Sequence, residues 1–205
     1  MADHKNLEHT LHPATNVLTR GFDPALSVGS ARPAVFRSST YVFSSPEAAA
    51  RAFEVATGRA QPAEGEKIEL IYSRINHPNA EILEDQMVPL ERGAEAAAVF
   101  NSGMAAIMTA ILAVSKPGDR FVYTVPLYGG TYSFIHQFLE GFGICGVAVP
   151  AGHGELLEEA IRSSQNLRFV FIETPANPTL RMTDIRRAAH AAAEAGLRQN
   201  GRVYV

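Results

Sequence analysis

The sequence predicts an α/β protein in which a mostly parallel β-sheet carries helices on both faces. From about residue 79 onward, short continuous apolar segments alternate with segments whose apolar residues recur every three or four positions. Continuous apolar segments are typical of strands buried on both faces, and the recurrent pattern is typical of helices that bury one side. Their regular alternation favours parallel strands joined by helical crossovers.

Four segments match the buried-strand pattern, and a fifth begins at the last residues. The strands are predicted at 96–100, 121–124, 145–149 and 169–172, and then from 203 to 205. Helices are predicted between them at 80–86, 103–114, 130–140, 156–163 and 184–195. Gly141 and Gly196 are expected to close the third and fifth helices, because a glycine commonly follows the last helical turn.

The first 65 residues follow a different pattern. Aromatic and β-branched residues at 35–43 favour extended chain, and a helix is expected at Pro46–Ala56 with Ser45 as its N-cap. This region has too little regular patterning to bury its own core. We therefore interpret residues 1–65 as an extended arm that must pack on something else, and 66–205 as the first part of the sheet domain.

Composition is that of a folded soluble protein, with 46% hydrophobic and 19% charged residues. The net charge of -3 gives no reason to expect nucleic acid or an anionic membrane as a partner. The single cysteine, Cys145, excludes an intrachain disulfide and is expected to be a small buried hydrophobe. The opening residues lack a signal-peptide pattern, and no apolar run is long enough to cross a bilayer, so a cytoplasmic protein is predicted.

Three loops follow predicted strands and therefore fall on one edge of the sheet, where ligands gather in open α/β sheets. The loop 101–106 leads into a helix, and Gly103 lets an anion approach the unpaired N–H groups there. This loop is either a phosphate seat or an ordinary turn capped by Ser102. Tyr128, in the loop 126–131, either stacks on a flat heteroaromatic ligand or covers a glycine turn.

The loop 173–179 contains Asn177, whose amide is suited to hydrogen-bond a ring oxygen of a ligand. Glu173 in the same loop either affects the local electrostatics or caps a backbone group. The alternative for the whole loop is a plain turn. In a fourth loop, 72–79, Tyr72 and Arg74 are suited to grip a phosphate through a hydroxyl and a guanidinium. The alternative interpretation is a solvated loop that precedes a helix. No metal site is expected.

In order and spacing, these segments resemble the Cys/Met-metabolism family of pyridoxal-phosphate enzymes, which includes cystathionine γ-synthase, cystathionine γ- and β-lyases, methionine γ-lyase and O-acetylhomoserine sulfhydrylase. The resemblance implies fold type I and makes 66–205 the first part of the cofactor-binding domain. It implies that Ser102, Gly103 and Met104 bind the cofactor phosphate. It also implies that Tyr128 stacks on the pyridine ring and assists proton transfer.

The same resemblance assigns Asn177 to the cofactor's phenolic oxygen and places the acidic Glu173 nearby. Tyr72 and Arg74 match the pair that reaches the phosphate of a neighbouring subunit. The resemblance therefore implies a dimer or tetramer with shared active sites, in which the arm of residues 1–65 makes subunit contacts. The implied activity is γ-elimination or γ-replacement on a homoserine-, cysteine- or methionine-type substrate in sulfur amino-acid metabolism. The chain departs from the family by having His77-Pro78-Asn79 where Asn-Pro-Thr is common, which leaves the substrate open.

The family's Schiff-base lysine and the aspartate that pairs with the pyridine nitrogen have no counterpart here. The only lysines are Lys5, Lys67 and Lys116. We therefore interpret the chain as the N-terminal half of a lyase or transferase, cut before the sheet and the C-terminal domain are complete. The alternative function is a catalytically incompetent fragment or pseudoenzyme. A nucleotide-binding module is disfavoured because no glycine-rich phosphate motif of that class occurs.

Overall fold

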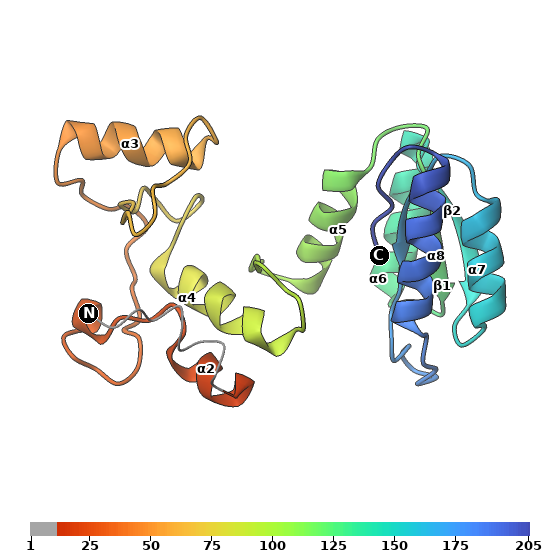
Figure 1. Ribbon diagram of the computed structural model, residues 1–205, viewed down its shortest axis with the longest axis horizontal. Helices are drawn as coiled ribbons and strands as arrows, with labels where there is room; N and C mark the ends of the chain where they lie inside the picture. Colours follow the sequence, from red (N-terminus) through yellow and green to blue (C-terminus); the bar gives the residue numbers. More distant parts are fainter. Residues whose placement is uncertain (1–11) are drawn as a thin grey trace. The chain divides into compact units, whose positions relative to one another are not determined.

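The computed structural model describes residues 12–205, which form two compact units (Figure 1). The first unit ends at Val99 and the second runs from Phe100 to Val205. Residues 66–99 thus group with the arm, whereas the sequence assigned them to the sheet domain. That domain assignment stays a prediction about the protein as a whole. The tail residues His4, Lys5 and His9 lie outside the described part.

The first unit consists of short helices joined by irregular chain. Its elements are α2 (Pro13–Thr19), η1 (Pro24–Ser27), α3 (Pro46–Ala56), α4 (Pro78–Met87) and η2 (Val88–Leu90). The prediction for α3 is confirmed, because Ser45 Oγ accepts the Ala48 N–H at 3.1 Å and Pro46 occupies the first position. Asn79, at the start of α4, accepts the Phe36 N–H at 2.9 Å and so holds the extended segment against this helix.

The predicted strand at 96–100 is wrong. These residues form irregular chain, and the Val99 N–H donates to the Glu84 carboxylate rather than to a neighbouring strand. Val99 and Phe100 are 43% and 41% exposed. A run of apolar residues becomes a buried strand only when another strand satisfies its backbone groups, and none of the described strands lies against this run.

The second unit is built on a parallel sheet in the order β2-β1-β3. The strands are β1 (Arg120–Val125), β2 (Cys145–Pro150) and β3 (Leu167–Phe171), so three of the four complete predicted strands are confirmed. Val122 lies opposite Val147 of β2 and Val170 of β3. The segment predicted to begin a further strand makes one parallel bridge, between Tyr204 and Phe169.

Helices cover both faces of this sheet, as the sequence predicts (Figure 1). They are α5 (Gly103–Val114), α6 (Gly129–Phe134), α7 (Gly154–Ser163) and α8 (Ile185–Arg198). Successive residues of β1 point to opposite faces. Val122 packs with α7 and α8, and Phe121 and Tyr123 pack with α5 and α6.

Two predicted helix ends are wrong. The helix after β1 continues beyond α6 as a π-helical turn, Ile135–Leu139, and a short 3-10 turn, Glu140–Phe142, so Gly143 with φ 73° ends it rather than Gly141. Gly196 lies inside α8, which extends to Arg198. A Cβ on Gly196 would come 2.6 Å from the Gly201 carbonyl oxygen. This glycine is needed for close packing and not as a terminator.

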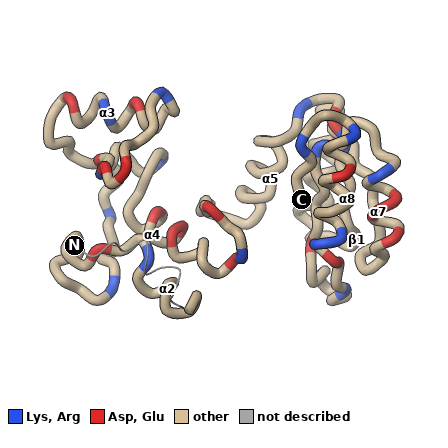
Figure 2. Tube along the Cα trace, in the orientation of Figure 1, with Lys and Arg blue, Asp and Glu red and all other residues tan. Residues whose placement is uncertain are grey.

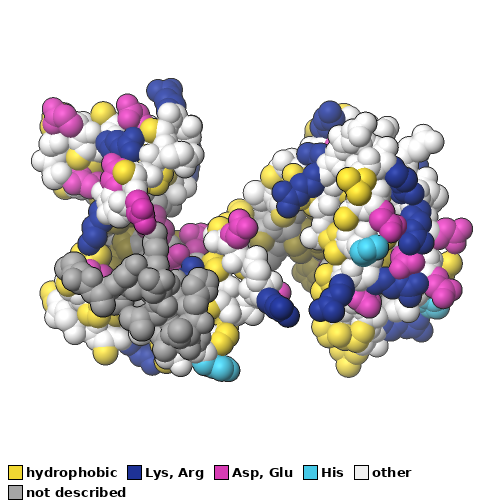
Figure 3. Space-filling view, viewed as in Figure 1, with side chains coloured by type: hydrophobic (Ala, Val, Ile, Leu, Met, Phe, Trp, Pro, Cys, Tyr) yellow, Lys and Arg dark blue, Asp and Glu magenta, His cyan; other side chains and the backbone are white. Residues whose placement is uncertain are grey.

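Charged residues of both signs are mixed along α7 and α8 (Figure 2), and the same mixture covers the face of the second unit seen in Figure 3. Glu158 of α7 pairs with Arg187 of α8, and Arg162 pairs with Glu194 at 3.4 Å. Hydrogen bonding to Arg187 lowers the pKa of the Glu158 carboxyl. These ion pairs join the two helices along their outer edge, above the apolar layer.

Cys145 is exposed, so the prediction that it is a buried hydrophobe is wrong. It is the first residue of β2, which is an edge strand of the three-stranded sheet. Within residues 12–205, no group of three or more His, Cys, Asp or Glu side chains is placed to hold a metal ion. Over the same range, every helix is too short or too polar to cross a bilayer.

Candidate functional site

The loops that follow β1 and β3 are joined at the carboxyl edge of the sheet by one carboxylate. Glu173 Oε2 accepts the Tyr128 backbone N–H at 2.8 Å, and Glu173 Oε1 accepts the Thr131 hydroxyl at 3.4 Å. The Glu173 N–H donates in turn to the Thr124 hydroxyl at 3.3 Å. Parallel strands end at the same edge, which is why residues 45 positions apart meet here.

The first turn of α5 lies against the start of α6. Thr131 Oγ1 is 3.8 Å from Met104 Sδ. A Cβ on Gly130 would come 3.0 Å from the same sulfur and 2.6 Å from Cε1 of Tyr128. The structure therefore brings Met104, Tyr128 and Glu173 together, as the sequence predicts for three loops on one edge.

The N-terminus of α5 has the features of an anion seat. Ser102 Oγ accepts the Ala105 N–H at 3.1 Å, which confirms Ser102 as the N-cap. Within the described residues, the N–H groups of Gly103 and Met104 have no hydrogen-bond partner. A Cβ on Gly103 would meet nothing within 4 Å. Free N–H groups, the helix dipole and open space on the Gly103 side fit the phosphate of a cofactor.

Tyr128 keeps its ring accessible while its backbone is fixed. The residue is 57% exposed, although its N–H is held by Glu173 and its carbonyl accepts the Tyr132 N–H at 3.0 Å. An accessible aromatic ring on a fixed backbone suits stacking against a flat heteroaromatic ring. Tyr128 thus covers Gly130, and its ring also remains accessible to a ligand.

Asn177 lies in the loop after β3, which is therefore on the same edge. The loop is closed by a bridge between Ala176 and Arg181, with the Ala176 N–H donating to the Arg181 carbonyl at 2.9 Å. Asn177 is exposed. No hydrogen bond in the described part of the chain joins it to Ser102, Tyr128 or Glu173, so its approach to a ring oxygen stays a prediction.

Tyr72 and Arg74 lie in the first unit and form a pair there. The Arg74 guanidinium donates to the Tyr72 hydroxyl, and its Cζ lies 5.2 Å from the centre of the Tyr72 ring. The backbone of the pair is held by a bridge between Tyr72 and Thr40. A cation and a hydroxyl presented side by side match the expected phosphate grip, whose role in a second subunit stays a prediction.

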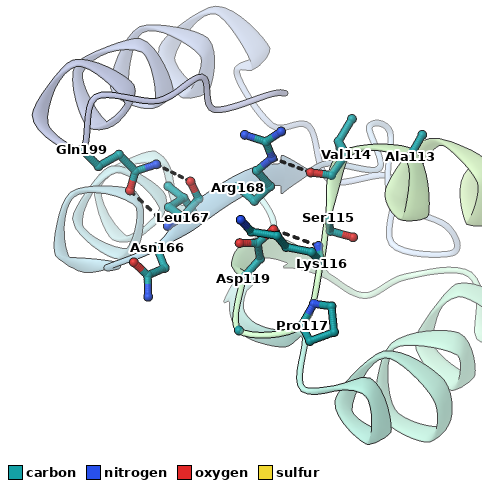
Figure 4. A pocket seen from close by; sticks show the side chains of 11 residues that line it. Ala113, Val114, Ser115, Lys116, Pro117, Asp119, Asn166, Leu167, Arg168 and Gln199 are labelled. Atoms are coloured by element: carbon teal, nitrogen blue, oxygen red, sulfur yellow. Dashed lines mark hydrogen bonds between the residues drawn. The ribbon is translucent and has the colours of Figure 1, made fainter.

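Lys116, the lysine of the second unit, lies at the opposite edge of the sheet from Tyr128. Lys116 precedes β1 and lines a cleft of about 640 Å³ at the amino edge of the sheet, with Asp119, Arg168 and Gln199 (Figure 4). Tyr128 follows the other end of β1. The six residues of this strand span about 20 Å at about 3.3 Å per residue. Lys116 therefore does not reach the ring of Tyr128, and Lys67 belongs to the first unit.

A family model described as "Cys/Met metabolism PLP-dependent enzyme" matches residues 14–199. The chain belongs to this family. An L-methionine gamma-lyase of Porphyromonas gingivalis is 37% identical over 158 residues, which are 77% of this chain and 36% of that protein. A cystathionine gamma-lyase of Bacillus subtilis is 39% identical over 145 residues, 71% of this chain and 37% of the relative.

The crystal structure of metB from Corynebacterium glutamicum matches with a TM-score of 0.73 and 28% identity, over 95% of this chain and 44% of that one. The α/β fold of type I PLP-dependent enzymes is therefore confirmed. The chain spans about two fifths of the length of the curated relatives it matches. Pyridoxal phosphate is the cofactor of the family.

The sequence pattern did not identify three residues that contribute to this edge of the sheet. Thr124 and Thr131 are 1% and 0% exposed and bind Glu173, and Gly130 lies against the Tyr128 ring. A threonine in an otherwise apolar strand, as in 121–125, is a usable signal because a buried hydroxyl requires a partner. The sequence does not say which partner it finds.

Proposed function

We propose that the protein is a pyridoxal-phosphate-dependent enzyme of sulfur amino-acid metabolism that performs γ-elimination or γ-replacement on a methionine-, cystathionine- or homoserine-type substrate. The observation that supports this best is that the Tyr128 ring and the Met104 sulfur, in the first turn of α5, both flank Gly130, with Met104 Sδ 3.8 Å from Thr131 Oγ1. An anion seat beside an accessible aromatic ring suits a ligand that is both flat and phosphorylated. The relatives named as methionine and cystathionine gamma-lyases support the substrate class.

When bound, pyridoxal phosphate supplies an electron sink that makes the α-hydrogen of an amino acid acidic. The chain's own residues bind and orient this group. The N–H groups of Gly103 and Met104, with the Ser102 turn, hold the phosphate, and the Tyr128 ring covers one ring face. Asn177 donates its amide N–H to the phenolic oxygen. The Tyr128 hydroxyl would assist proton transfer, the role that the family resemblance implies for it.

We also propose that Tyr72 and Arg74 bind the phosphate of a second subunit, so that the enzyme is a dimer or tetramer with shared sites. The support is their pairing in the first unit, where the Tyr72 hydroxyl and the Arg74 guanidinium are presented together. Lys116, at the opposite edge of the sheet, has no part in this site. A cytoplasmic location stays a prediction from the sequence.

Binding of pyridoxamine 5′-phosphate to the 205-residue protein tests the proposal. This analogue carries an amine in place of the aldehyde, so it cannot react with Lys116 or Lys67 and reports the non-covalent site alone. We expect saturable binding that competes with pyridoxal 5′-phosphate and weakens at least tenfold for pyridoxamine without phosphate. Tyr128→Ala should weaken binding about tenfold, whereas Tyr132→Phe, on the exposed side of α6, should not. Equal binding by Tyr128→Ala and the unaltered protein would contradict the proposal.

A further inference from the structure

Glu173 is placed to hold the chain and not a ligand. Both of its carboxylate oxygens are engaged by the segment 128–131, one by the Tyr128 N–H at 2.8 Å and the other by the Thr131 hydroxyl at 3.4 Å. A carboxylate that accepts a backbone N–H forms one of the stronger hydrogen bonds in proteins. With one oxygen on each partner, the group bridges the first turn of α6.

Two of the residues that bond to Glu173 are buried. Thr131 is fully buried, and its hydroxyl also lies 3.8 Å from Met104 Sδ in the first turn of α5. Thr124, which accepts the Glu173 N–H, is 1% exposed within β1. Glu173 is therefore held to the central strand by its backbone N–H, and to the start of α6 by its carboxylate. The Tyr128 backbone cannot shift without breaking this set of contacts.

We propose that Glu173 is a positioning residue, which sets the place of the Tyr128 ring beside the α5 N-terminus by clamping the Tyr128 N–H and the Thr131 hydroxyl. We call Glu173, Thr131 and Thr124 the Glu173 clamp. This inference rests on the proposed function, and it replaces the role near the cofactor ring that the family resemblance suggests for Glu173. The clamp acts through hydrogen-bond acceptance, and a glutamine at this position would keep one acceptor oxygen for the Tyr128 N–H.

The clamp is tested first without any cofactor, by amide hydrogen exchange of the free protein followed residue by residue. Glu173→Ala should speed exchange at Tyr128 at least tenfold and leave Val122, in the core of β1, unchanged. Glu173→Gln keeps an amide oxygen as acceptor and should stay within threefold of the unaltered protein. Unchanged exchange at Tyr128 in Glu173→Ala would overturn the clamp. If Glu173→Ala does not fold, Thr131→Val, matched by Thr131→Ser, removes the second anchor of the carboxylate and should speed exchange at Tyr128 by a smaller factor, about threefold, with Thr131→Ser unchanged.

Binding of pyridoxamine 5′-phosphate is the second readout. We expect Glu173→Ala to weaken binding at least fivefold and Glu173→Gln to restore it to within twofold. Equal losses in both variants would assign Glu173 to direct charge contact with the ligand and overturn the positioning role. If the unaltered protein binds no analogue, the proposed function fails while the exchange comparison still decides whether the clamp exists.

Discussion

The ring of Tyr128 rests against the backbone of Gly130. A Cβ at residue 130 would come 2.6 Å from Tyr128 Cε1 and 3.0 Å from Met104 Sδ. Side chains in close-packed regions do not tolerate such separations without moving. Glycine at this position is therefore the reason that the ring can lie over the first turn of α6, next to the N-terminus of α5. A Cβ at the neighbouring Gly129 would meet nothing within 4 Å.

Gly130→Ala is expected to displace the Tyr128 ring and weaken binding of pyridoxamine 5′-phosphate about tenfold, which is about 1.4 kcal/mol. Stability should change little, because alanine favours the helix by about 1 kcal/mol and offsets part of the crowding. Gly129→Ala is the matched control, since it gains the same helix preference without touching the ring. Calorimetric titration and urea unfolding of both variants give the two quantities. Similar affinities in the two variants would show that the ring position does not matter.

Ser102→Ala removes the hydroxyl that accepts the Ala105 N–H, and we expect it to lower the free energy of unfolding by about 0.5–2 kcal/mol. Ser102→Asp keeps an N-cap acceptor and should retain stability. Its added negative charge lies where the phosphate is proposed to bind, so phosphate-ligand affinity should fall more than in the alanine variant. Urea unfolding and ligand titration separate the two effects. An aspartate variant that binds as well as the unaltered protein would argue against a phosphate seat at this turn.

The fold class could be predicted from the sequence because the strands and helices of the second unit bury apolar residues with clear periodicity. Phe121, Val122 and Tyr123 alternate between two helix layers, and the continuous apolar run that they form predicts a strand buried on both faces. The segment 96–100 is also apolar, but no described strand lies beside it. Apolar composition indicates that a segment is suited to a buried strand, but it does not identify the neighbouring strand that the segment needs.

The candidate site was predictable as far as the topology fixes it. Tyr128 and Glu173 follow parallel strands, so their meeting at one edge follows from the fold. The direction of the Glu173 carboxylate, toward the Tyr128 N–H and Thr131, depends on side-chain packing that no local pattern encodes. Likewise, the end of α8 beyond Gly196 depends on the approach of Gly201 from outside the helix.

Acid is expected to loosen the first unit through Glu66. Its carboxylate binds Arg51 through two 2.8 Å hydrogen bonds and accepts the Ala63 N–H at 2.7 Å. These contacts, the Arg51 hydrogen bond first, lower the pKa of Glu66 from 4.5 to about 2. Because the folded pKa is depressed, the stabilisation is present above about pH 4.5 and is lost as the pH falls toward 2.

Thermal unfolding between pH 7 and pH 2 tests this dependence. The difference in Tm between the unaltered protein and Glu66→Gln should be largest at neutral pH and should shrink across the interval from pH 4.5 to pH 2. Arg51→Gln should show the same loss, because it removes the partner that lowers the pKa. A difference that stays constant with pH would mean that Glu66 contributes no charge-dependent stability.

Cys145 is expected to react with a thiol reagent in the folded protein. It is exposed at the first residue of the edge strand β2, and its N–H donates to the Asp119 carbonyl at 3.2 Å. The thiol of Cys145 is therefore accessible to a reagent in solution.

Ellman's reagent should label one thiol without denaturant, at a rate within about tenfold of that in urea. Cys145→Ser should show no labelling and should change the free energy of unfolding by less than about 0.5 kcal/mol, as for other surface substitutions. Labelling that requires urea would restore the interpretation of Cys145 as a core residue and would mean that this edge of the sheet is covered.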